Sequence, residues 1–137
     1  MSKIFIDTNI LVFALDNYDK QKKQKSKQIL TDVISKQIAV ISTQVLQELY
    51  VAGTTKLSID PILMKNIVHA FENVEVVIID TDLIKEAIDT SVLNKVSFWD
   101  SLIVVAAEKA KCESLYTEDF NHGQIIRGVR VENPYMS

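Results

Sequence analysis

Residues 3–11 read Lys-Ile-Phe-Ile-Asp-Thr-Asn-Ile-Leu, and they pass from a strand pattern into a helix pattern at Asp7. The apolar run Lys3–Ile6 predicts a first strand, and Thr8–Leu15 predicts a short helix directly after it. Asp7 therefore follows the carboxyl end of a strand, which is where open α/β sheets bind their ligands.

The same alternation of short apolar runs and helical stretches continues along the chain. Further strands are expected at residues 38–41, 74–79, 113–117 and 128–131, the last one at an edge of the sheet. Further helices are expected at residues 20–36, 43–51, 61–71, 81–93 and 98–111. Gly53 is expected to close the helix 43–51, and Ile84, Ala87, Ile88 and Val92 are expected to face inward. No linker or repeat interrupts the pattern, so residues 1–137 are expected to form a single α/β domain with a mainly parallel sheet of four to five strands.

The composition is that of an ordinary folded protein. The chain has 137 residues, 47% of them hydrophobic, and 15 Lys+Arg against 18 Asp+Glu give a net charge of −3. This balance argues against binding nucleic acid by bulk positive charge, but it does not exclude a nucleic acid substrate. The single Cys112 excludes an internal disulfide and a multi-cysteine metal site, and it favours a reducing, cytoplasmic location. No secretory signal or membrane-spanning run is seen, so no membrane partner is expected.

Four acidic residues fall at related places on the predicted elements. Asp7 and Asp119 follow strands, Glu48 lies two turns into the helix after the second strand, and Asp100 lies in the first turn of an apolar helix. Each has an ordinary structural explanation. Asp7 could cap a helix, Asp100 could complete a capping box and Asp119 could form an Asx turn, whereas Glu48 flanks an apolar face and fits a surface role least well.

These acids have few cationic neighbours in the sequence. No Lys or Arg lies within one helical turn of Asp7, Glu48 or Asp100. Grouped carboxylates without cations would repel one another and raise their own pKa values, and a divalent cation resolves that conflict. Oxygen-only ligands favour Mg²⁺, Mn²⁺ or Ca²⁺ over Zn²⁺.

Four segments follow one another along the chain in a recognisable order. They are Phe5-Ile6-Asp7-Thr8-Asn9-Ile10-Leu11, Ser42-Thr43-Gln44-Val45-Leu46-Gln47-Glu48, Ser97-Phe98-Trp99-Asp100-Ser101-Leu102-Ile103 and Tyr116-Thr117-Glu118-Asp119-Phe120. Together they resemble the PIN domain, in particular the VapC-type toxin ribonucleases of toxin–antitoxin pairs. The resemblance implies a three-layer α/β/α sandwich and an endoribonuclease that depends on Mg²⁺ or Mn²⁺.

The resemblance also assigns roles to individual residues. Asp7, Glu48, Asp100 and Asp119 match the family's acidic positions, where Asp7, Asp100 and Asp119 would hold the metal. Glu48 would be a further ligand or would help to deprotonate the attacking water. The supporting polar positions are Thr8, Asn9 and Thr117, and Glu118 is an extra acid that could point either into the site or out of it. Asn121 stands where some relatives have an acid, which leaves open whether one or two metals bind.

Several other side chains carry two explanations each. Five lysines close together in the sequence form either a solvated helix start or a contact to the RNA backbone. They are Lys20, Lys22, Lys23, Lys25 and Lys27. Trp99 is expected to pack in the core rather than to stack on a base. Arg127 and Arg130 are expected to be ordinary edge charges rather than part of the substrate path.

The helices between residues 43 and 71 carry more apolar side chains than one buried face needs. Leu57, Ile59, Leu63 and Met64 are the surplus, which predicts a groove or a homodimer surface. The resemblance points the same way, because similar proteins form homodimers and are wrapped by an antitoxin that obstructs the acidic site.

Three rival functions remain open on sequence alone. A PIN-like scaffold without catalysis would bind RNA or a protein partner only. A haloacid-dehalogenase-like phosphatase would need a second aspartate at the position of Asn9. A receiver-type phosphoacceptor would place its acceptor after a middle strand, where Asp80 is a poor match.

Overall fold

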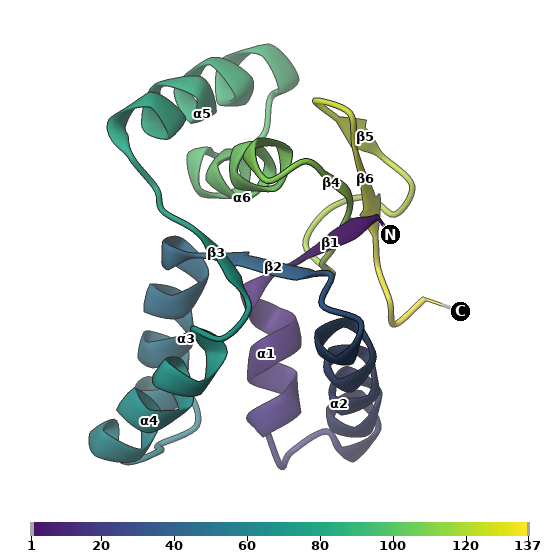
Figure 1. Ribbon diagram of the computed structural model, residues 1–137. Helices are drawn as coiled ribbons and strands as arrows, with labels where there is room; N and C mark the ends of the chain where they lie inside the picture. Colours follow the sequence, from purple (N-terminus) through teal and green to yellow (C-terminus); the bar gives the residue numbers. More distant parts are fainter. Residues whose placement is uncertain (1, 137) are drawn as a thin grey trace.

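A six-stranded sheet forms the centre of the computed structural model, which describes residues 2–136 (Figure 1). The strand order is β3-β2-β1-β4-β6-β5, and every neighbouring pair is parallel except β5 and β6. The strands are β1 (Lys3–Ile6), β2 (Ala39–Ser42), β3 (Glu75–Val77), β4 (Cys112–Tyr116), β5 (Ile125–Ile126) and β6 (Val129–Glu132). The predicted α/β fold with a mainly parallel sheet is confirmed, but the sheet has six strands rather than four to five.

The additional strand is β5, which pairs antiparallel with β6 at the edge of the sheet. It is only two residues long, so no alternation of polar and apolar residues could indicate it. The connecting residues Arg127 and Gly128 both have positive φ angles, +50° and +78°, which suit a tight two-residue hairpin turn.

Helices cover both faces of the sheet. The four helices α1 (Thr8–Leu15), α2 (Lys20–Ser35), α3 (Thr43–Thr55) and α4 (Pro61–Phe71) lie on one side, and α5 (Thr81–Asn94) and α6 (Phe98–Lys109) lie on the other (Figure 1). Each begins after a residue whose side chain accepts a backbone N–H of the first turn: Asp7, Asp19, Ser42, Asp60, Asp80 and Ser97.

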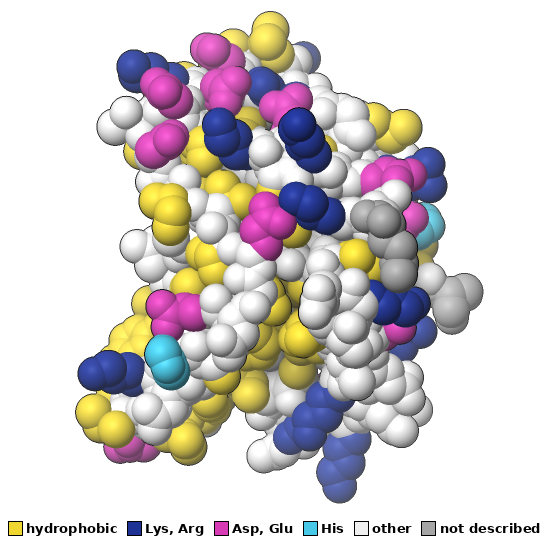
Figure 2. All heavy atoms as spheres, in the orientation of Figure 1, with side chains coloured by type: hydrophobic (Ala, Val, Ile, Leu, Met, Phe, Trp, Pro, Cys, Tyr) yellow, Lys and Arg dark blue, Asp and Glu magenta, His cyan; other side chains and the backbone are white. Residues whose placement is uncertain are grey.

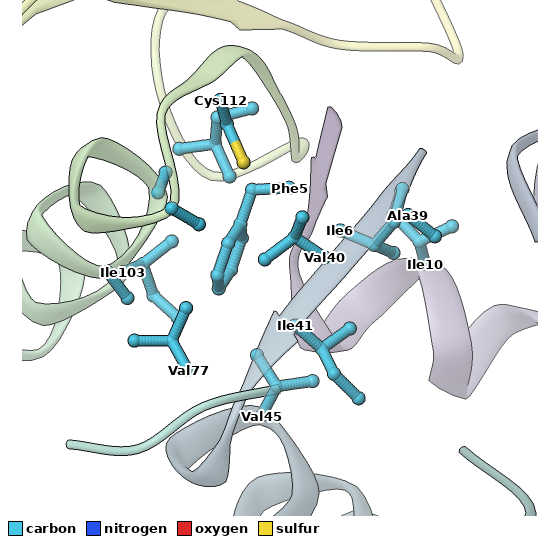
Figure 3. Packing of buried hydrophobic residues seen from close by; sticks show 14 of the residues in the cluster. Phe5, Ile6, Ile10, Ala39, Val40, Ile41, Val45, Val77, Ile103 and Cys112 are labelled. Atoms are coloured by element: carbon cyan, nitrogen blue, oxygen red, sulfur yellow. The ribbon is translucent and has the colours of Figure 1, made fainter. Parts of the chain in front are cut away.

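The two faces of β1 explain why both helix layers pack on this sheet. Successive side chains of a strand point to opposite faces, so Phe5 and Ile6 enter different halves of the core. Figure 3 shows Phe5 on the side of Ile103 from α6, and Ile6 on the side of Ile10 from α1. Both strand side chains are at most 1% exposed, as expected for a central parallel strand.

The helix α3 does not end at Gly53, contrary to the prediction. It continues to Thr55, because Gly53 is a packing position rather than a terminator. A Cβ atom at Gly53 would lie 2.3 Å from Sδ of Met64, a fully buried side chain of α4. Met64 therefore belongs to the core, whereas the Leu63 side chain remains 53% exposed.

The predicted inward face of α5 is also wrong in part. Ala87 is buried, but Ile84, Ile88 and Val92 are exposed, and Leu83 and Thr90 face inward instead. The predicted face and the observed buried face lie close together around α5. The packing of α5 against α6 determines which of the two is buried. The exposed isoleucines leave an apolar row on the outer surface of the molecule.

Candidate active site

Five acidic side chains line one cleft of about 650 Å³, and they are Asp7, Glu48, Asp100, Glu118 and Asp119. Glu118 is paired with Lys22, whereas the other four form no ion pair within residues 2–136. Asp7 caps α1 directly after β1, and Asp119 follows β4 by three residues. Glu48 comes from α3, and Asp100 comes from the first turn of α6. Because β1 and β4 are parallel neighbours, their carboxyl ends deliver Asp7 and Asp119 to the same edge of the sheet.

The most buried of these acids is Asp7, whose residue is only 4% exposed. Its Oδ1 accepts the backbone N–H of Thr8 at 2.7 Å, and its Oδ2 accepts the hydroxyl of Thr117 at 2.7 Å. The hydroxyl oxygen of Thr117 in turn accepts the backbone N–H of Asp119 at 3.1 Å. Thr117 therefore joins the two acids that follow β1 and β4.

Glu48 and Asp119 are oriented by neighbours from α1. The hydroxyl of Thr8 donates to Oε1 of Glu48 at 2.6 Å, and Nδ2 of Asn9 donates to Oδ2 of Asp119 at 3.1 Å. The junction after β1 thus supplies one acid, Asp7, and two polar side chains that orient two more acids.

Sequence reasoning missed Gln44 as a member of the site. Its Nε2 lies 3.4 Å from Oε2 of Glu48 and donates at 3.2 Å to the backbone carbonyl of Trp99. A signal was available, because a residue four positions before Glu48 shares its helix face. Gln44 therefore connects α3 to the start of α6.

The acids disturb one another electrostatically. Burial raises the pKa of Asp7 to about 7, hydrogen bonds from Thr117 and Thr8 oppose the rise, and repulsion from Asp119 and Glu48 adds to it. The pKa of Asp119 is also raised, first by burial and then by repulsion from Asp100 and Glu118. Within residues 2–136, no ion pair involves Asp7, Glu48, Asp100 or Asp119.

The donor set fits a hard divalent cation. It consists of carboxylate oxygens that lack a cationic partner, together with Oδ1 of Asn9, a buried oxygen without a hydrogen-bond partner in the described structure. In their present positions, no three acidic, histidine or cysteine side chains of residues 2–136 are close enough to share an ion. The carboxylates would have to rotate to do so.

The five lysines near the start of α2 do not act as one group. Lys22 forms an ion pair of 2.9 Å with Glu118 and lies 4.4 Å from the ring centroid of Phe13. Lys23 bonds to the side chain of Asn17. The other three, Lys20, Lys25 and Lys27, are exposed. Figure 2 shows Lys and Arg side chains in dark blue at the lower end of the molecule, on the side where Figure 1 places α2.

Two other predictions have clear outcomes. Trp99 does not pack in the core, since 63% of it is exposed and it lines the cleft. Arg127 forms ion pairs with Glu86 and Glu108 and donates to Thr90, all near the end of α6 opposite to Asp100. It therefore joins the β5–β6 turn to α5 and α6 rather than lining the cleft.

Comparisons with known proteins give one matching family model and several similar structures. The model of the PIN domain family matches residues 4–126. A toxin–antitoxin complex from Klebsiella pneumoniae is similar in structure with a TM-score of 0.73 and 23% identity, covering 98% of each chain. A DNA-bound VapBC complex from Salmonella typhimurium gives a TM-score of 0.68 and 22% identity, covering 98% of this chain and 99% of that one.

A third similar structure is VapC20 of Mycobacterium tuberculosis, described as a toxin that cleaves the sarcin–ricin loop. Its TM-score is 0.69 at 18% identity, covering 85% of this chain and 90% of that chain. A search of curated proteins found no match. At these identities the similar structures establish the fold, and no activity follows from them alone.

Proposed function

Because the chain belongs to the PIN domain family, we propose that it is a metal-dependent endoribonuclease and the toxin of a toxin–antitoxin pair. The observation that carries this proposal is the convergence of Asp7, Glu48, Asp100 and Asp119 on one cleft without a cationic partner. PIN domains are typically metal-dependent nucleases, which agrees with this donor set.

In the proposed site, Asp7, Asp100 and Asp119 would hold Mg²⁺ or Mn²⁺ after their carboxylates had rotated toward one another. A bound ion of this kind supplies charge neutralisation at the scissile phosphate and makes the attacking water more acidic. Glu48 is either a further ligand or the base that accepts a proton from that water. The Thr8 hydroxyl fixes Oε1 of Glu48, and Asn9 fixes Oδ2 of Asp119, so both act by positioning.

The reaction is tested with a mixed RNA pool and mapped products. We expect cleavage only with Mg²⁺ or Mn²⁺, leaving a 5′-phosphate and a 3′-hydroxyl, because water attacks the phosphorus and the 3′-oxygen leaves. Equal cleavage in EDTA, or a 2′,3′-cyclic phosphate product, would refute the mechanism. Turnover of a small aryl phosphate instead of RNA would indicate a phosphatase, and tight partner binding without any cleavage would indicate an idle scaffold.

The exposed lysines of α2 give a prediction on RNA affinity. Replacing Lys20, Lys25 and Lys27 by glutamine should weaken RNA binding about three- to tenfold at low salt and reduce its dependence on salt concentration. The three side chains point into solvent, so stability should hardly change. Fluorescence anisotropy of labelled RNA over a salt series measures both effects.

The control variants are Lys85→Gln and Lys109→Gln, which lie on the other side of the sheet. Lys22→Gln would be a poor control because Lys22 pairs with Glu118. An unchanged salt slope would assign the lysines to a solvated surface.

An apolar groove of about 590 Å³ between α3 and α4 suits the proposed antitoxin. It shares Gln47 and Val51 with the acidic cleft, so the two are adjoining. A segment of the antitoxin lying in this groove would bring an arginine or lysine to the carboxylates. Similar structures include toxin–antitoxin complexes, which supports this assignment.

The expected partner is a small DNA-binding protein encoded next to this gene. The chain is also proposed to form a homodimer, which sedimentation analysis tests. No helix within residues 2–136 is long and apolar enough to cross a membrane.

A further inference from the structure

Trp99 is a large aromatic side chain exposed at the edge of the acidic cleft. It precedes Asp100 in the sequence, lines the cleft and is 63% exposed. An indole of this size normally buries much of its surface, and its exposure beside charged groups carries a cost that packing within the chain does not recover. Trp99 is therefore placed to contact a ligand in the cleft.

Contacts with Phe98 and Gln44 hold Trp99 in place at the start of α6. Its ring packs edge-on against Phe98, with 5.1 Å between ring centroids and an interplanar angle of 72°. Its backbone carbonyl accepts the hydrogen bond from Gln44. Gln44 also approaches Glu48, so the backbone of Trp99 is tied to the helix that carries an acid of the site.

We propose that Trp99 stacks on an unpaired RNA base next to the scissile phosphate. This inference rests on the proposed ribonuclease function. Trp99 is adjacent in sequence to Asp100, a proposed metal ligand. A base stacked on Trp99 would therefore belong to a nucleotide whose phosphate lies close to the proposed metal site. Base stacking on an aromatic ring tolerates any sequence and favours single-stranded RNA, so the indole would select unpaired substrate rather than one base.

The lining of the cleft beside Trp99 suits a nucleotide. It combines the acids Glu48 and Asp100 with apolar side chains such as Phe13 and Ile103. The apolar groove between α3 and α4, which suits the proposed antitoxin, does not include Trp99. A nucleobase has a flat apolar face and a polar edge, so it matches a lining that is apolar in part and polar in part.

Trp99 is the only tryptophan of the chain, so its fluorescence reports the contact directly. The full chain is titrated with a short single-stranded RNA in Ca²⁺, which limits cleavage, while anisotropy of a labelled copy measures binding independently. We expect the RNA to quench Trp99 emission by about half or more. The same oligonucleotide with abasic sites in place of its bases should bind about tenfold more weakly and leave the emission nearly unchanged.

Two variants separate stacking from apolar bulk. Trp99→Phe should keep RNA affinity within about threefold, whereas Trp99→Leu should raise KM about tenfold with kcat nearly unchanged. Binding without quenching, or equal behaviour of the two variants, would overturn the stacking proposal and leave the nuclease function standing. An emission shift that follows protein concentration without RNA would assign Trp99 to a contact between copies and also overturn it. If no RNA is bound or cleaved with any divalent metal, the proposed function itself fails and this inference with it.

Discussion

Replacing Asp7 by asparagine should reduce RNA cleavage at least 100-fold and should also make the metal-free protein more stable. The loss of activity follows because the amide is a poor ligand for Mg²⁺ and carries no charge. The gain in stability follows because Asp7 is buried, faces Asp119 and Glu48, and is offset by no cation in the described structure. Opposite signs for activity and stability are typical of a residue kept for function.

The stability effect of Asp7 should depend on pH in a defined direction. The folded-state pKa is about 7 and the unfolded value is 3.8. Well below pH 3.8 the carboxyl is neutral in both states, so it has no pH-dependent effect there. Between pH 4 and 7 only the unfolded state releases the proton, so the free energy of unfolding falls as pH rises. Asparagine carries no titrating proton, so Asp7→Asn avoids this fall in the free energy of unfolding. The variant should be about 1–3 kcal/mol more stable than the wild-type protein at pH 8, which includes the cost of its altered hydrogen bond to Thr117.

Urea denaturation in EDTA at pH 5 and pH 8, with cleavage assays in Mg²⁺, measures both effects. Asp19→Asn is the matched control, since Asp19 also caps a helix but does not line the cleft. It should leave cleavage and the pH dependence unchanged. Added Mn²⁺ should raise the Tm of the wild-type protein more than that of Asp7→Asn. A variant that cleaves RNA normally would remove Asp7 from the site.

The part of the site that sequence could predict is the part fixed by local structure. Asp7 follows a strand and opens a helix, and the start of α6 after Ser97 places Asp100 in a first turn. Such signals lie within a few residues of the acid concerned. Parallel pairing of β1 with β4 then brings Asp119 to the same edge, which is a general property of parallel sheets.

Features set by contacts between distant elements were not predictable in the same way. Gly53 resembles a helix terminator until Met64 of α4 occupies the space beside it. The inward face of α5 is decided by its packing against α6 and not by its own apolar pattern, which serves two faces almost equally. Trp99 has a large apolar side chain of the kind usually found in a core, and only the tertiary structure leaves it exposed.

Replacing Thr117 by valine should lower kcat about 10- to 100-fold without removing any acid. Thr117 is fully buried, and its hydroxyl both donates to Oδ2 of Asp7 and accepts the N–H of Asp119. Valine has the same shape but satisfies neither group, which leaves a buried carboxylate and a backbone N–H short of a partner. We therefore expect a loss of about 1–3 kcal/mol in the free energy of unfolding as well.

The pH dependence distinguishes this role from simple packing. The hydroxyl of Thr117 lowers the pKa of Asp7, so the valine variant should have a still higher pKa there. More of its Asp7 would then be protonated at pH 7, and it should need more Mn²⁺ for half-maximal cleavage at pH 7 than the wild-type protein, with a smaller difference at pH 9. Thr117→Ser keeps the hydroxyl and should restore the Mn²⁺ requirement, whereas a purely structural role would leave that requirement unchanged in both variants. Because serine also loses the methyl group, its stability should fall while its Mn²⁺ requirement recovers, and this opposite movement assigns the effect to the hydrogen bonds between Thr117 and the two acids.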